Sequence, residues 1–124
     1  MHKPEGFAAL VVLCALAATR GVNGGEALRM QVSPAVARAP AVLTVRVSIE
    51  AAADNRRLHV IAESPDFYRR SEIQVDGASA PPLNVFEFRD LPAGLYQVTG
   101  ELVGVNGPRA TISRLAKVEP SFGR

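Results

Sequence analysis

The sequence predicts an all-β fold in which about seven short strands form an antiparallel sandwich of two sheets. Beyond residue 25, apolar and polar residues repeatedly alternate with period 2, and no segment sustains the 3.6-residue period of an amphipathic helix. Turn-forming residues recur at intervals of roughly 8–12 residues. Because each such strand has one apolar face, two sheets must press these faces together to make a core.

The strand expected at residues 41–51 has the clearest pattern. Its alternate positions are apolar and the positions between them are polar or charged, so one set is expected to face the core: Leu43, Val45, Val47 and Ile49. A first strand is expected before it at residues 28–32. The segment between them, residues 35–40, is bounded by Pro34 and Pro40 and is expected to be a linker.

Further strands follow the turn signal Asp54-Asn55. Residues 58–63 alternate, with His59 on the outward side. A short strand at residues 73–75 is expected to end at the tight-turn dipeptide Asp76-Gly77. After a loop at residues 78–82, strands are expected at residues 86–89 and 95–105, with a hairpin turn at Asn106-Gly107.

The last expected strand, residues 111–118, alternates imperfectly. Ile112 and Val118 have the same parity, whereas Leu115 has the other. This irregularity predicts a β-bulge in the strand.

Residues 1–25 have the layout of a secretory signal peptide. A short basic start precedes an apolar run at residues 7–18, which is too short to span a membrane, and small residues follow it. We therefore expect a sandwich domain at residues 26–119, a flexible tail at 120–124, and a periplasmic or extracellular location in a bacterium, with no stable membrane span after cleavage. Cleavage would also remove Cys14, the single cysteine. The alternative is that the leader stays as a buried N-terminal helix.

Composition argues against several functions. The 14 basic and 12 acidic residues nearly balance, and no basic run exceeds two residues, so nucleic-acid binding is not expected. His59 would be the one histidine of the mature chain, and no G-x-S-x-G or calcium-loop motif is present. We expect no catalytic site, no metal and no cofactor.

The segment at residues 88–98, FRDLPAGLYQV, carries a resemblance. It resembles the corner before strand F of fibronectin type III and related immunoglobulin-like domains, and it is also similar to the LPAGxY turn of transthyretin-like and carboxypeptidase-regulatory-like sandwiches. The resemblance implies that Leu91 closes the bottom of the core. It also implies that the Tyr96 hydroxyl bonds to backbone a few residues upstream. The chain departs from these families in lacking the strand-B Trp of fibronectin type III and the core cysteines of antibody domains.

One segment is a candidate interaction loop, because it brings aromatic and arginine side chains together: Phe67, Tyr68, Arg69 and Arg70. The alternative is that Phe67 or Tyr68 caps the core while both arginines are solvated. A second candidate is residues 81–88, as an edge open to strand addition.

These observations favour a non-enzymatic exported module that binds a protein or glycan through its loops or edges. Two alternatives remain open. One is an assembly subunit that pairs edge strands, and the other is a small hydrolase that uses His59 or a pair of carboxylates.

Overall fold

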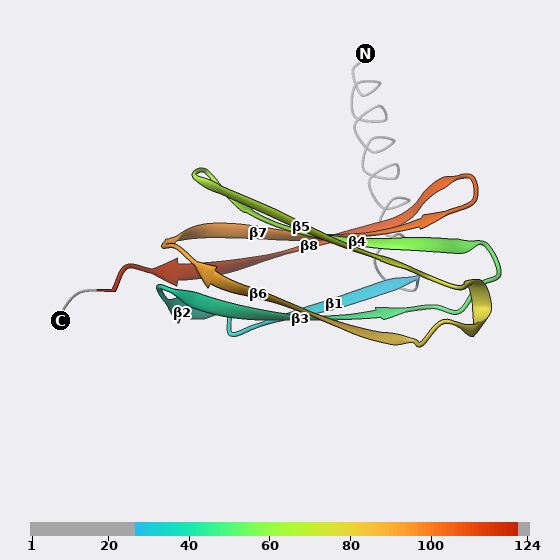
Figure 1. Ribbon diagram of the computed structural model, residues 1–124, viewed down its shortest axis with the longest axis horizontal. Coiled ribbons are helices and arrows are strands. Elements are labelled where there is room, and N and C mark those ends of the chain that lie inside the picture. The colour runs from blue at the N-terminus through green and yellow to red at the C-terminus, as the bar shows by residue number, and fades with distance from the viewer. Residues whose placement is uncertain (1–26, 122–124) are drawn as a thin grey trace, which may run out of the picture.

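The computed structural model describes residues 27–121, and these form two facing β-sheets with no α-helix (Figure 1). The strands are β1 (Leu28–Ser33), β2 (Val36–Arg38), β3 (Ala41–Ile49), β4 (Asn55–Ser64), β5 (Phe67–Gln74), β6 (Leu83–Leu91), β7 (Gly94–Gly104) and β8 (Gly107–Glu119). A single 3₁₀ turn, η1 (Gly77–Ser79), lies between β5 and β6. The expectation of an all-β fold with two sheets is confirmed.

The two sheets have the orders β1-β3-β6 and β2-β8-β7-β4-β5. Neighbouring strands are antiparallel except β2 and β8, which are parallel. The chain therefore passes from the three-stranded to the five-stranded sheet between β1 and β2, and it returns at β3. It changes sheets again between β3 and β4, between β5 and β6, and between β6 and β7.

The core lies between the sheets and is built from the period-2 pattern. On β3 the predicted inward residues are all buried: Leu43, Val45, Val47 and Ile49. On β4, Leu58, Val60 and Ala62 are likewise fully buried. Phe86 and Phe88 of β6 fill the same layer. The alternation thus identified the core face of each of these strands correctly.

The expected linker at residues 35–40 contains a strand, β2, so the described chain has eight strands rather than about seven. Val36 pairs with Lys117 and Arg38 with Glu119. Val36 is exposed, and Arg38 is exposed as well. The strand is held by main-chain bonds and directs only the small side chain of Ala37 toward the core, which is why no side-chain pattern indicated it.

The bulge expected near Leu115 is also wrong. The pairing of β7 with β8 runs without interruption from Gly94 to Leu102, and its register shift lies between Leu102 and Val103. Leu115 has the opposite parity from Ile112 and Val118 because its side chain points to solvent. The irregular alternation thus reflects an exposed leucine and not a break in the strand.

Two expected turns are displaced by one residue. The turn before β4 is Ala53-Asp54, and Asn55 is the first residue of the strand. Asn55 is fully buried: its Nδ2 donates to Glu50 O at 2.9 Å, and its Oδ1 accepts a bond from Arg109. The β7–β8 turn is Val105-Asn106, and Gly107 follows with φ +114°. Asp76 precedes η1, which is entered by Gly77 at φ +55°.

The expected signal peptide at residues 1–25 lies outside the described residues, as do the last three residues of the expected tail. Within residues 27–121, no helix is long and apolar enough to cross a membrane.

Candidate interaction face

The four residues of the expected interaction loop lie on a strand. Ser64 and Phe67 pair across the β4–β5 hairpin, and Pro65 and Asp66 form its two-residue turn. The strand β5 therefore starts at Phe67 and runs along the edge of the five-stranded sheet. Pro65 and Asp66 are turn-forming residues, and a two-residue turn leaves no room for a loop after them.

Strand alternation sends the four side chains to opposite sides. Phe67 and Arg69 are directed toward the other sheet, whereas Tyr68 and Arg70 belong to the outer face. The Phe67 ring meets the Tyr96 ring edge-to-face, with centroids 5.9 Å apart and planes at 71°. The Arg69 guanidinium lies 5.0 Å from the Phe67 ring centroid, and its Nη1 donates to Arg89 O at 2.8 Å. Residues 67–70 therefore belong to two groups, one directed toward the other sheet and one on the outer face.

We call the group on the core side the inner corner: Phe67, Arg69, Leu91 and Tyr96. Leu91 and Tyr96 are fully buried. The Tyr96 hydroxyl donates to Pro92 O at 2.7 Å, across the turn between β6 and β7. Burial raises the pKa of Tyr96 above its usual value, and the nearby Ser64 hydroxyl and Arg69 charge offset this only in part.

Gly94 makes this corner possible by its lack of a side chain. A Cβ placed on Gly94 would lie 3.2 Å from both Cβ and Oγ of Ser64 and 3.7 Å from the Tyr96 ring. The start of β7 therefore packs directly against the end of β4.

The outer face of the five-stranded sheet carries three large side chains that are more than half exposed. They are Tyr68 of β5 at 60%, Leu95 of β7 at 58% and Leu115 of β8 at 66%. We call these three residues the outer patch. Because the strands pair in register, Leu115 lies beside Gln97, Gln97 beside Glu63, and Glu63 beside Tyr68. Tyr68 and Leu115 are thus the two ends of one row across four strands, and Leu95 lies in the next row, where it pairs with Lys117.

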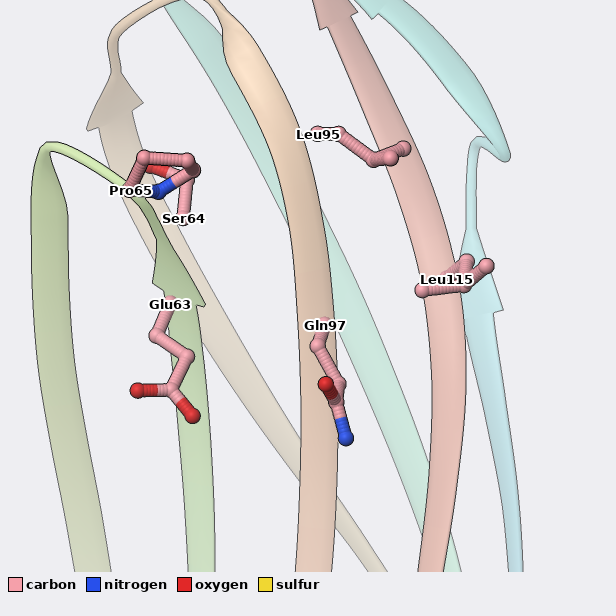
Figure 2. A pocket seen from close by; sticks show the side chains of 6 residues that line it. All are labelled: Glu63, Ser64, Pro65, Leu95, Gln97 and Leu115. Carbon is pink, nitrogen blue, oxygen red and sulfur yellow. The ribbon is translucent and has the colours of Figure 1, made fainter.

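A shallow depression of about 280 Å³ crosses this row (Figure 2). Leu95 and Leu115 line one side of it, and the end of β4 at Ser64 and Pro65 lines the other. Gln97 lies between the two sides on β7 and supplies an amide, and Glu63 lies next to Ser64 on β4 and supplies a carboxylate. The depression is therefore lined by both apolar and polar groups.

A charged cluster lies farther along the same face. His59 Nε2 lies 3.4 Å from Glu72 Oε1, and His59 Nδ1 lies 3.5 Å from Glu101 Oε1. Arg70 Nη2 is 3.1 Å from Glu72 Oε1 and 3.1 Å from His59 Nδ1. His59 lies on the outer face, as expected, but it is largely covered by its charged neighbours, and it does not line the depression.

Among residues 27–121, no group of three or more His, Cys, Asp or Glu side chains is arranged to hold a metal ion. His59 shows why: its two ring nitrogens face different glutamates, so no common point is surrounded by all three side chains.

Sequence reasoning missed Leu95 and Leu115 as surface residues. A signal for both was available, since Leu95 alternates with the core residues Tyr96 and Val98 in the outward parity, and Leu115 does the same relative to Ala116 and Val118. A leucine at an outward strand position is a candidate for contact with a partner.

No protein-family model matches this chain, and no curated protein matches it. Solved structures do. A superoxide reductase (neelaredoxin) from Ignicoccus hospitalis is similar with a TM-score of 0.59 and 14% identity, over 76% of this chain and 81% of that one. The sulfur carrier protein SoxY from Chlorobium limicola f thiosulfatophilum is similar with a TM-score of 0.52 and 14% identity, over 93% and 96% of the two chains. At this identity the likeness establishes a small all-β sandwich-like fold and nothing of the activity.

Proposed function

We propose that this protein is a non-enzymatic exported binding module that contacts a protein partner through the outer patch. The observation that carries the proposal is the placement of Tyr68, Leu95 and Leu115 on one face of the five-stranded sheet, each more than half exposed. Exposed apolar side chains gathered on one surface are typical of interaction sites. Aromatic residues such as Tyr68 are also enriched where binding energy is concentrated.

The surroundings of the patch favour a protein over a small molecule. Small-ligand sites usually bury most of the ligand, whereas this depression is shallow and open. Glu63 and Gln97 provide polar groups within the patch, and Lys117 lies beside Leu95. Apolar side chains interspersed with hydrogen-bonding groups are usual in a protein–protein interface.

We further propose that the fold is immunoglobulin-like. The Greek-key connections between the two sheets support this assignment, as does the bond from Tyr96 on β7 to Pro92 at the β6–β7 turn. We propose a fibronectin type III-like domain, with the transthyretin-like or carboxypeptidase-regulatory-like sandwiches as the alternative.

Export is proposed from the leader-like segment at residues 1–25. The intact mass of the protein recovered from the extracytoplasmic fraction of its native host tests it. Loss of about 17 to 25 N-terminal residues would support export, and a full-length protein confined to the cytoplasm would contradict it.

The binding site is tested by a matched pair of charge substitutions. Leu115→Glu places a carboxylate in the outer patch, whereas Val105→Glu places one at another apolar position that is more than half exposed, in the β7–β8 turn. Each variant is expressed in the native host and crosslinked there, and the captured proteins are identified by mass spectrometry. We expect one set of partners to be lost with Leu115→Glu and kept with Val105→Glu. Capture of the same proteins by both variants would contradict the proposal.

A further inference from the structure

The edge strand β6 of the three-stranded sheet presents an unpaired main chain beside exposed apolar side chains. Leu83 is 52% exposed and Val85 is 57% exposed. Among residues 27–121, no strand pairs with the side of β6 that faces away from β3. An exposed, apolar edge strand is a template for another strand. This surface lies on the opposite sheet from the outer patch, and the argument for it is independent of the proposed function.

The pairing with β3 determines which groups of β6 are free. Ile49 N donates to Pro82 O at 2.9 Å, so Ile49 and Pro82 face each other as a bonding pair. Bonding and non-bonding pairs alternate along an antiparallel ladder. Asn84, Phe86 and Phe88 therefore bond to β3, and the intervening residues direct their N–H and C=O groups outward: Leu83, Val85 and Glu87.

Both ends of this free stretch are closed. Pro81 and Pro82 precede it and have no N–H to offer. Beyond it, the carbonyl of Arg89 already accepts a bond from Arg69 Nη1 at 2.8 Å. The open ladder is thus limited to the residues from Leu83 to Glu87, and its centre is Val85.

We propose that β6 pairs antiparallel with β6 of a second copy of this chain, with Val85 on the two-fold axis. In this register Val85 faces Val85 of the second copy, and Leu83 faces its Glu87. Each facing pair exchanges two hydrogen bonds, and every free group of the stretch is used. The two three-stranded sheets then become one six-stranded sheet.

The side chains fit this register as well as the main chain does. On one face of the sheet Val85 lies opposite Val85 of the second copy, and Leu83 is diagonal to that Val85, within reach of its side chain. No charge faces a like charge, since Glu87 is opposite Leu83 and is already paired with Arg89 of its own chain at 2.8 Å. The other long edge, β5, carries Arg70 and Glu72 at its free positions, and charges of this kind discourage strand addition.

Two substitutions at Val85 test the proposal, with sedimentation velocity measured from about 1 μM to about 1 mM protein. Val85→Pro removes an N–H that the monomer does not use, and proline is tolerated at such edge positions. Two hydrogen bonds are lost per dimer, so we expect dimerisation to weaken roughly thirtyfold. Val85→Lys sets two like charges face to face and is expected to weaken dimerisation by about tenfold or more.

The matched control is Val42→Lys, which places the same charge on the same sheet but on the central strand β3. We expect a dimer for the parent chain and for Val42→Lys, and a shift to monomer for both Val85 variants, with unchanged circular dichroism. A parent chain that is monomeric throughout the concentration range overturns the proposal. So does a dimer that persists in Val85→Lys, since that dimer would use another surface or the residues before β1.

Discussion

The inner corner and the outer patch contain similar residues at the same end of the molecule, but their environments are opposite. Phe67 and Tyr68 are consecutive in the chain, as are Leu95 and Tyr96. In each pair one residue packs between the sheets and the other faces solvent. Tyr96 is fully buried and bonded, whereas Tyr68 is 60% exposed.

This comparison shows that the position of a residue along the strand decides whether its side chain packs in the core or lies on the surface. An aromatic or leucine side chain contributes to the core at one position and to a surface at the next. Substitutions in the inner corner should therefore change the free energy of unfolding. Substitutions in the outer patch should leave it nearly unchanged and should affect partner binding instead.

The largest difference is expected between Tyr96→Ala and Leu115→Ala. Tyr96→Ala leaves a cavity beside Phe67 and should lower the free energy of unfolding by about 3–5 kcal/mol, as for other large buried aromatic residues. Leu115→Ala removes a side chain that is mostly in water and should change it by less than about 0.5 kcal/mol. Urea denaturation of the two variants measures both values. Equal losses of unfolding free energy in the two variants would mean that the inner corner and the outer patch contribute equally to stability.

A smaller effect isolates the Tyr96 hydroxyl. Tyr96→Phe keeps the ring but removes the bond to Pro92 O, and it should cost about 1 kcal/mol. Because burial raises the pKa of Tyr96 in the folded protein, the unfolded chain loses this proton first as the pH rises above about 10. Stability is then lost as the pH increases toward the pKa of the folded state.

The pH dependence gives this prediction its control. Urea midpoints measured at about pH 8 and about pH 10.5 should differ more for the parent chain than for Tyr96→Phe. An identical alkaline loss in both proteins would show that other groups cause it.

The smallest effect compares two adjacent arginines. Arg69→Ala removes a bond to Arg89 O and a contact with the Phe67 ring, and it should cost about 1 kcal/mol. Arg70→Ala removes exposed contacts with Glu72 and His59 on the outer face and should cost less than about 0.5 kcal/mol. The thermal unfolding midpoints of Arg69→Ala and Arg70→Ala measure this difference between the two sides of β5. A larger loss of stability in Arg70→Ala than in Arg69→Ala would contradict the assignment of Arg69 to the inner corner.

Much of the fold was predictable because burial imposes a local pattern on strands. The alternation in β3 and β4 predicted which side chains are buried, and the Phe86–Phe88 pair marked β6. The pattern failed at β2, where the strand is made by main-chain pairing and only Ala37 packs against the core. It also failed at the start of β5. The outward residues Tyr68, Arg70 and Glu72 are polar or amphipathic, so the segment has the composition of a loop although it is a strand.

The candidate site was less predictable than the fold. The sequence correctly drew attention to residues 67–70, but it could not separate Phe67 from Tyr68 without the position of the turn at Pro65-Asp66. The outer patch was missed because it joins residues from distant strands, Tyr68 of β5 and Leu115 of β8. Only the order of strands in the sheet brings them into one row.

The parallel pairing of β2 with β8 has a mechanical consequence. The segment that enters β2 and the segment that leaves β8 extend from opposite ends of one short ladder, in which Lys117 N donates to Ala35 O and Ala39 N donates to Glu119 O. A pull that separates residues before Val36 from residues after Glu119 draws the two strands past each other lengthwise. Under such tension the ladder is loaded in shear. Its hydrogen bonds then share the force and break together instead of one after another.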